Sequence, residues 1–204
     1  RFTIFHFSLF IFHFSLIMFS ISFSSDAPIT GAFSHLLADI PGGVTLSSEV
    51  LGGAYLKAGT PIGKDTAGRY AVCKTAQLSA QATSAATSLQ VRKGHHFLPG
   101  DYIASDSSNG KKIKSIDKSN PAYDLLVLQE AISVELSKNT PLFASKGEDK
   151  IPKVTPSALV SATLIVPQRS NLFCAATLIG VVREELIPPI PESFKEHLRG
   201  IFFI

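Results

Sequence analysis

Two adjacent histidines, His95 and His96, and one cysteine, Cys73, are the reactive side chains from which a catalytic or metal site could be built. His95 and His96 lie close in the chain to Asp101 and Asp106, and imidazole and carboxylate groups are common metal ligands. Adjacent residues of a strand point to opposite faces, however, so the two histidines would not hold one ion together. Cys73 could act as a nucleophile activated by a histidine. The simpler interpretation of Cys73 is a small buried apolar residue.

Two other features could carry charge-based chemistry, but neither forms a recognisable site. Lys111, Lys112 and Lys114 make a small basic cluster, which we interpret as a solvated hairpin end rather than a nucleic-acid surface. Glu184 and Glu185 supply carboxylates, and nothing in the sequence pairs them for acid–base catalysis.

The sequence contains no G-x-S-x-G, H-E-x-x-H or G-x-G-x-x-G pattern. Its two Gly-Lys pairs, at Gly63 and Gly110, lack the hydroxyl residue that follows in a phosphate-binding loop. We therefore assign no catalytic, cofactor-binding or metal-binding residue and predict a protein that is not an enzyme and has no cofactor. A hydrolase that uses Cys73 or His95 stays an alternative.

Composition limits the class of protein further. A chain of 204 residues predicts one domain or at most two small ones. Charged residues make up 17% and the net charge is +3, which argues against a dedicated nucleic-acid binder. Two cysteines, Cys73 and Cys174, are too few for a disulfide scaffold or a four-cysteine zinc site. Whether these two cysteines meet in space is open, and unpaired thiols would fit a reducing compartment.

Residues 1–25 form a hydrophobic segment that differs from the rest of the chain. Eight of the fifteen phenylalanines lie within residues 2–23, together with Ile, Leu, Ser and His. One interpretation is upstream sequence translated in frame, with the true start at Met18. A second is a signal peptide or membrane anchor, since about 20 apolar residues can span a bilayer. A third is a packed element of the fold. Residues 26–43 contain Pro28, Pro41 and a Gly-Gly pair, which predict an extended N-terminal arm.

The sequence predicts that short strands carry these residues. From residue 44 onward, short β-branched runs alternate with Gly, Pro, Asn and Asp, the pattern of an all-β fold built as a small barrel or sandwich with short hairpins. We expect strands within 44–51, 69–74, 89–91, 123–131, 158–166 and 173–182.

The Asn109-Gly110 pair predicts a hairpin that joins the strand at 102–104 to the strand at 112–116. The β domain thus covers residues 44–204, with a polar linker near 145–157.

The C-terminus carries the only helix that the sequence predicts with its caps. Ser193 and Glu196 have the spacing of a capping box, and Gly200 is a natural helix stop. The chain then ends in four apolar residues, 201–204. Exposed apolar residues are a liability, so we expect this tetrapeptide to be buried in the domain or across a subunit contact.

Four segments of the chain resemble one family of phage proteins. These are residues 56–72 (LKAGTPIGKDTAGRYAV), 91–101 (VRKGHHFLPGD), 116–125 (IDKSNPAYDL) and 182–190 (VREELIPPI). In this order they are similar to head decoration or head fiber proteins of tailed phages with gut Bacteroidetes-like hosts. The segments lie within residues 44–204, and the first 25 residues do not match.

The resemblance implies a structural virion protein on the capsid surface, made in the host cytoplasm. It implies the major capsid protein as partner and a homo-oligomer, with a trimer favoured. It implies no nucleic acid, no small-molecule substrate and no catalytic residues. The 26–43 arm would then reach onto the capsid. The alternative is a secreted or membrane-anchored bacterial β domain that uses residues 2–23 for targeting. Decoration and fiber roles, the capsid site and the oligomer size are left open.

Overall fold

A computed structural model gives the structure of residues 31–168 and 170–204. The hydrophobic segment 1–25 and the first part of the expected arm, 26–30, lie outside the described residues. The interpretations of that segment therefore stay predictions. Within the described residues, no helix combines the length and the apolar character needed to cross a membrane.

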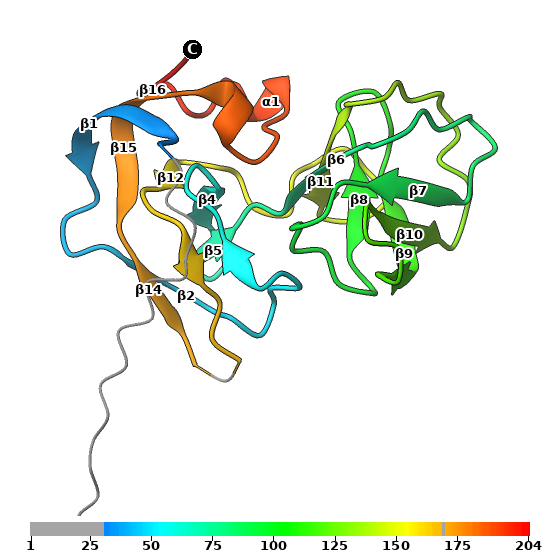
Figure 1. Cartoon of the computed structure of the whole chain (residues 1–204), viewed down its shortest axis with the longest axis horizontal. Coiled ribbons are helices and arrows are strands. Elements are labelled where there is room, and N and C mark those ends of the chain that lie inside the picture. The colour runs from blue at the N-terminus through cyan, green and yellow to red at the C-terminus, as the bar shows by residue number, and fades with distance from the viewer. Residues whose placement is uncertain (1–30, 169) are drawn as a thin grey trace, which may run out of the picture.

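The fold is nearly all β, as the sequence predicts, and it consists of two lobes that lie side by side (Figure 1). The terminal lobe contains residues 31–73 and 154–204. The inserted lobe contains residues 74–153 and interrupts the terminal lobe between two of its strands. Each lobe has its own six-stranded sheet, and the arrangement is sandwich-like rather than one closed barrel.

Sheet A belongs to the terminal lobe. Its strands run in the order β1-β15-β12-β4-β5, and β16 pairs in parallel with the second half of β15. All its other pairings are antiparallel. Its strands are β1 (Phe33–Asp39), β4 (Pro61–Lys64), β5 (Tyr70–Val72), β12 (Ala158–Val160), β15 (Ala176–Val182) and β16 (Ile201–Phe203).

Sheet B forms the inserted lobe, in the order β6-β11-β8-β9-β10-β7. It curls around its core until its two edge strands meet, where Leu78 bridges Val91 and Ser79 donates its N–H to the carbonyl of Gln90 at 2.9 Å. Its strands are β6 (Thr75–Gln77), β7 (Ser88–Val91), β8 (Tyr102–Ala104), β9 (Lys111–Asp117), β10 (Asp124–Leu128) and β11 (Pro141–Ser145).

Two small antiparallel pairs and two short helical turns complete the terminal lobe. The β2–β14 pair packs its buried residues Val44, Leu46 and Leu172 into the same core as Ile62 of β4. The elements are β2 (Val44–Leu46), β3 (Tyr55–Leu56), β13 (Leu164–Ile165), β14 (Leu172–Cys174), the 3-10 helix η1 (Glu184–Leu186) and helix α1 (Glu192–Lys195).

The two lobes share an apolar core at their junction. Phe143 of β11 and Phe194 of α1 pack with ring centroids 5.2 Å apart, and both side chains are fully buried. Ala104 and Cys73 belong to the same cluster. Burial of two phenylalanines stabilises the junction by roughly 2 kcal/mol each. The lobes are therefore joined at this point by a shared apolar core as well as by the chain that connects them.

The expected hairpin is confirmed, but its turn is not the one predicted. Strand β8 pairs with β9, with Tyr102 opposite Lys112. Asn109-Gly110 is part of a longer connection over residues 105–110 rather than a two-residue turn. Gly110 instead lets the backbone pass close to Gly147, whose carbonyl a Cβ would contact. A close approach, rather than a positive φ, accounts for this glycine.

The prediction of an extended arm over 26–43 is wrong for its described part. Phe33–Asp39 is strand β1 at the edge of sheet A, with Leu36 opposite Gly180. Gly42 and Gly43, both at positive φ, then turn the chain toward β2. The pattern hid this strand because most of β1 is exposed, so no alternation of buried and exposed residues marks it.

The expected capping box is also wrong. Pro191 stands at the N-cap of α1, and Ser193 is inside the helix, where its hydroxyl donates to Asp106 of the inserted lobe at 2.5 Å. The helix ends before Gly200, which sits in a turn ahead of β16. The hydroxyl of Ser193 therefore forms a contact between the lobes and does not cap the helix.

Candidate functional site

His95 is buried in the inserted lobe and has no free basic nitrogen. Its Nδ1 accepts a hydrogen bond from the Phe97 N–H at 3.2 Å, so the neutral ring carries its proton on Nε2. Nε2 lies 3.2 Å from Oδ2 of Asp124, but it is not aligned for a hydrogen bond. Burial lowers the pKa of His95 to about 4, and the Asp124 carboxylate opposes this shift. This histidine is therefore not placed to act as a general base.

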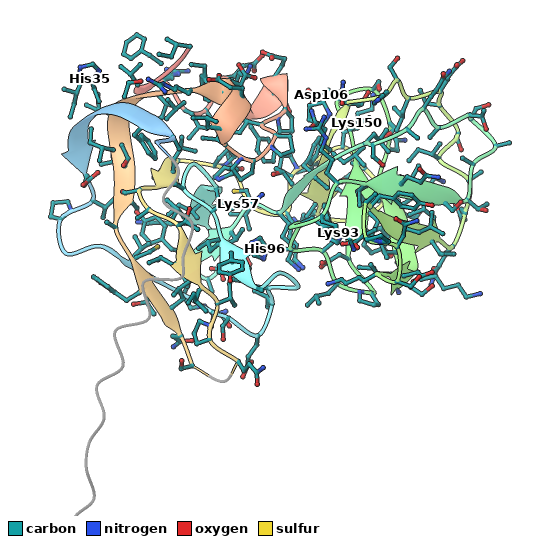
Figure 2. All side chains as sticks on the ribbon, in the orientation of Figure 1. His35, Lys57, Lys93, His96, Asp106 and Lys150 are labelled. Atoms are coloured by element: carbon teal, nitrogen blue, oxygen red, sulfur yellow. The ribbon has the colours of Figure 1, made fainter. Side chains whose placement is uncertain are left out.

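His96 joins the two lobes. Its Nδ1 accepts the N–H of Gly53, and its carbonyl accepts the N–H of Gly52, each at 3.2 Å. Figure 2 shows His96 at the boundary between the lobes. Burial lowers its pKa to about 4. The neighbouring imidazoles of His95 and His96 thus bond to different partners. No group of three or more His, Cys, Asp or Glu within the described residues could hold a metal ion.

Asp101, which is close to the two histidines in the sequence, is bound to other partners than Asp106. Its Oδ2 pairs with Lys74 at 2.6 Å and accepts the N–H of Leu98 at 2.9 Å. Lys153 is 3.5 Å from the other carboxylate oxygen. Asp106 faces helix α1 instead, as Figure 2 shows. The carboxylates near the histidines therefore hold the fold together in two separate places.

Both cysteines are free and buried, and they lie in different cores. Cys73 belongs to the cluster at the junction of the lobes, and Cys174 to the core beneath β2 and β14. Burial raises the pKa of the Cys73 thiol far above its usual value and that of Cys174 to about 11. Among the described residues no hydrogen bond joins Cys73 to a histidine. The interpretation of Cys73 as a buried apolar residue is confirmed.

Three of the remaining charged residues that the sequence analysis names have partners near the surface. Lys111 pairs with Glu130 at 2.7 Å, and Lys112 lies over the ring of Tyr102. Glu184 of η1 pairs with Lys195 of α1 at 2.8 Å.

Asp124 is the member of the buried polar cluster that the sequence did not indicate. It forms an ion pair with Lys93 at 2.7 Å and lies 3.2 Å from Nε2 of the neutral His95 ring. Its two partners come from a loop far away in the chain, so no local spacing could reveal them.

A cleft of about 890 Å³ lies between the lobes. Its first wall is the edge of β5 with the turn before it, and its second is a hairpin over residues 144–153. The segment around β2 forms the third wall. The lining residues are Thr45, Ser47, Glu49, Val50, Asp65, Thr66, Gly68, Arg69, Tyr70, Ala71, Val72, Cys73, Lys74, Ala144, Lys146, Lys153, Val154 and Asn171.

A second surface, which we name the outer apolar surface, lies on β15 and on the C-terminal segment that contains β16. Register places Phe202 opposite Val181, and alternation puts Ile179 and Ile204 on the same face of sheet A as Phe202. The members of this surface are Ile179 (42% exposed), Phe202 (61%) and Ile204 (64%). Leu36 of β1 is also exposed, but it lies opposite Gly180 and therefore on the other face of sheet A, and Leu37 lies at a register shift. Figure 2 shows His35, also of β1, on the side of the terminal lobe away from the inserted lobe.

Residues 201–204 are buried within the domain only in part, although the sequence analysis expects all four to be buried. Ile201 is buried within the domain, but Phe202 and Ile204 are not. The backbone of Ile204 is nevertheless held on both sides, because it donates to Val182 and accepts from Glu184 at 2.9 Å each. Phe202 and Ile204 are therefore exposed to solvent although the backbone of this segment is hydrogen-bonded to the domain.

Comparison of the chain with models of protein families, with curated proteins and with solved structures found no match. The fold and the surfaces described above are consequently the basis on which function can be inferred.

Proposed function

We propose that this chain is a structural protein of a phage particle that binds the outside of the capsid, as a head decoration or head fiber protein. The observation that carries this proposal is the outer apolar surface. Three large apolar side chains, those of Ile179, Phe202 and Ile204, are each at least two-fifths exposed and share one face of sheet A on β15 and the C-terminal segment. Contiguous exposed apolar side chains of this kind mark interaction sites.

The chemistry of the interior supports a role in binding rather than in catalysis. His95, the buried candidate base, has its basic nitrogen occupied by backbone, and the thiol of Cys73 is buried and protonated at neutral pH. A capsid accessory needs a rigid domain with an adhesive surface and no reaction centre. The two-lobed β fold, closed by an apolar junction, meets that requirement.

The partners in this proposal are the major capsid protein and further copies of the chain, with a trimer favoured. A ring of copies uses a heterologous contact, in which one surface of each copy meets a different surface of the next. The outer apolar surface supplies one half of such a contact. Binding only the mature shell would stabilise that shell by mass action.

The proposal is tested on purified virus particles from the source of the sequence. The tryptic peptide of residues 119–138, SNPAYDLLVLQEAISVELSK, is quantified by mass spectrometry against peptides of the major capsid protein. Comparable copy numbers in the particle support the proposal. If the peptide occurs only in a bacterial envelope fraction, the proposal is wrong, and the anchored or secreted β domain takes its place.

A binding experiment then tests the surface itself. The double variant Phe202→Glu/Ile204→Glu is compared with Ile151→Glu, a control whose side chain is 57% exposed on the inserted lobe. We expect the double variant to lose co-sedimentation with capsid shells while the control retains it. Equal sedimentation of both variants would show that the outer apolar surface is not the contact.

A further inference from the structure

The cleft between the lobes runs along an unpaired strand edge. Strand β5 is the last strand of sheet A, and its only described sheet partner is β4. Six consecutive residues, 69–74, line the cleft, so it follows the backbone of the strand and not only one face. Strand β5 itself spans Tyr70–Val72, so at about 3.3 Å per residue its edge is roughly 10 Å long and can pair with three residues of an extended peptide.

The register shows which backbone groups of β5 point into the cleft. Asp65 donates to the carbonyl of Arg69 at 2.8 Å, and Cys73 donates to the carbonyl of Pro61 at 2.9 Å. Hydrogen-bonded pairs alternate along an antiparallel ladder, so Ala71 also bonds to β4. The N–H and C=O groups of the intervening residues 70 and 72 consequently face away from β4. These groups form a template for another strand.

The charges around this edge are uneven. Arg69 pairs with Asp65 at 3.4 Å, and Lys74 pairs with Asp101 at 2.6 Å, so two of the four cations that line the cleft are balanced. The other two come from the hairpin of residues 144–153. Its backbone bonds pair position 144 with 153 and position 146 with 151.

Because cross-strand partners and alternate residues share a face, Lys146 and Lys153 lie on the same side of that hairpin. Both side chains are exposed. Lys153 lies 3.5 Å from the Asp101 carboxylate, farther than Lys74, which lies at 2.6 Å. Lys146 has no ion pair within the described part of the chain. One uncompensated carboxylate, that of Glu49, faces them across the cleft.

We propose that the cleft binds an extended acidic peptide segment of a partner protein, which adds as a strand to the free edge of β5 and places its carboxylates against Lys146 and Lys153. Backbone hydrogen bonds to residues 70 and 72 would give the affinity, and the two lysines would select the charge of the peptide. This inference does not depend on the outer apolar surface, which lies on other strands of the terminal lobe.

An extended peptide fits the cleft better than a nucleic acid does. A strand-shaped ligand satisfies the unpaired amide and carbonyl groups of β5, whereas a phosphate backbone has no donor for the carbonyls.

The test uses a fluorescent octapeptide of alternating valine and glutamate. Two matched peptides accompany it: one with lysine in place of glutamate, and one with alternate backbone nitrogens methylated. Binding to the full chain is measured by fluorescence anisotropy, and its position by amide shifts of residues 69–74. We expect the acidic peptide to bind and to shift these amides. The methylated peptide should bind about tenfold more weakly, since it cannot pair with the edge.

The protein variant that tests the charge is Lys146→Glu/Lys153→Glu, and Lys114→Glu on β9 is the control for a change of exposed charge. We expect the double variant to weaken binding of the acidic peptide about tenfold and the control to leave it unchanged. Circular dichroism verifies that both variants are folded.

Four results would overturn the inference. They are equal binding of the lysine peptide, equal binding of the methylated peptide, no detectable binding at millimolar peptide, and a poly-thymidine oligonucleotide shifting the same amides. Failure here leaves the capsid proposal intact, because virion mass spectrometry does not depend on the cleft.

Discussion

The ammonium group of Lys74 lies 2.6 Å from Oδ2 of Asp101, with the two side chains only 6% and 9% exposed. Lys74 is the first residue of the inserted lobe, and its carbonyl also accepts the N–H of Ala144 at 2.9 Å. The chain therefore enters this lobe through a buried ion pair. Burial lowers the pKa of Lys74, and the Asp101 carboxylate opposes that shift.

Removal of one partner of this pair should be costly. Lys74→Met leaves the Asp101 carboxylate buried, with the exposed Lys153 at 3.5 Å as its remaining cation. We expect a loss of about 3 kcal/mol in the free energy of unfolding. Urea denaturation measures it. The control is Lys111→Met, which breaks an ion pair whose glutamate is 69% exposed and should change stability by less than about 1 kcal/mol. Similar losses in the two variants would contradict the structural role of the buried pair.

The stability of the protein should fall as the pH drops below about 6.5. The folded chain keeps His95 and His96 neutral, since burial lowers both pKa values from 6.5 to about 4. The unfolded chain takes up these protons first, so the stabilisation is complete above pH 6.5 and is lost as the pH falls toward 4. At pH 5 the loss amounts to about 2 kcal/mol per histidine.

Urea denaturation at pH 7.5, 6 and 5 measures this dependence, in a range where most carboxylates stay ionised. His95→Gln should flatten the curve, because it removes one of the two groups. A free energy of unfolding that is constant from pH 7.5 to pH 5 would show that the imidazoles are not buried as neutral groups.

The junction of the lobes should be sensitive to truncation of its central aromatic residue. Phe194→Ala removes the ring that packs on Phe143 and leaves a cavity, for which we expect a loss of about 4 kcal/mol. Phe202→Ala is the matched control, because that ring is 61% exposed and its removal should change stability by less than about 0.5 kcal/mol. Thermal denaturation with calorimetry measures both. If both variants melt with the parent protein, the junction contributes little.

The two thiols should react slowly while the protein is folded. At pH 8 both are protonated in the folded chain, because burial raises their pKa values, and Cys73 is the more strongly affected. We expect a disulfide reagent such as DTNB to modify Cys174 before Cys73, and both rapidly in urea. Fast modification of folded Cys73 would instead support the hypothesis of a nucleophilic cysteine.

Local sequence patterns predicted the strand content well. The expected strand at 69–74 contains β5, and the 102–104 and 112–116 segments pair as β8 and β9. Such segments alternate apolar and polar residues or end at glycine turns, which are local signals. The one short helix near the C-terminus is also confirmed.

The division into two lobes and the buried polar cluster were not predictable in the same way. Thr75 pairs with Phe143, and Phe33 with Val182, so the sheets join residues that are distant in the chain. The His95–Asp124 contact likewise depends on how β10 packs beside β7, which no spacing encodes. The exposed strand β1 lacked the alternation on which strand prediction depends.

The pairing of β6 with β11 has a consequence for synthesis of the protein. These strands begin and end the inserted lobe, and they lie side by side, with Phe143 opposite Thr75. The ribosome therefore synthesises every residue of sheet B before it synthesises β12 or β15. The inserted lobe can fold first, while β1 and β4 wait unpaired for strands still to be translated. A pause in translation after residue 153 would prolong the interval in which those earlier strands are open to aggregation.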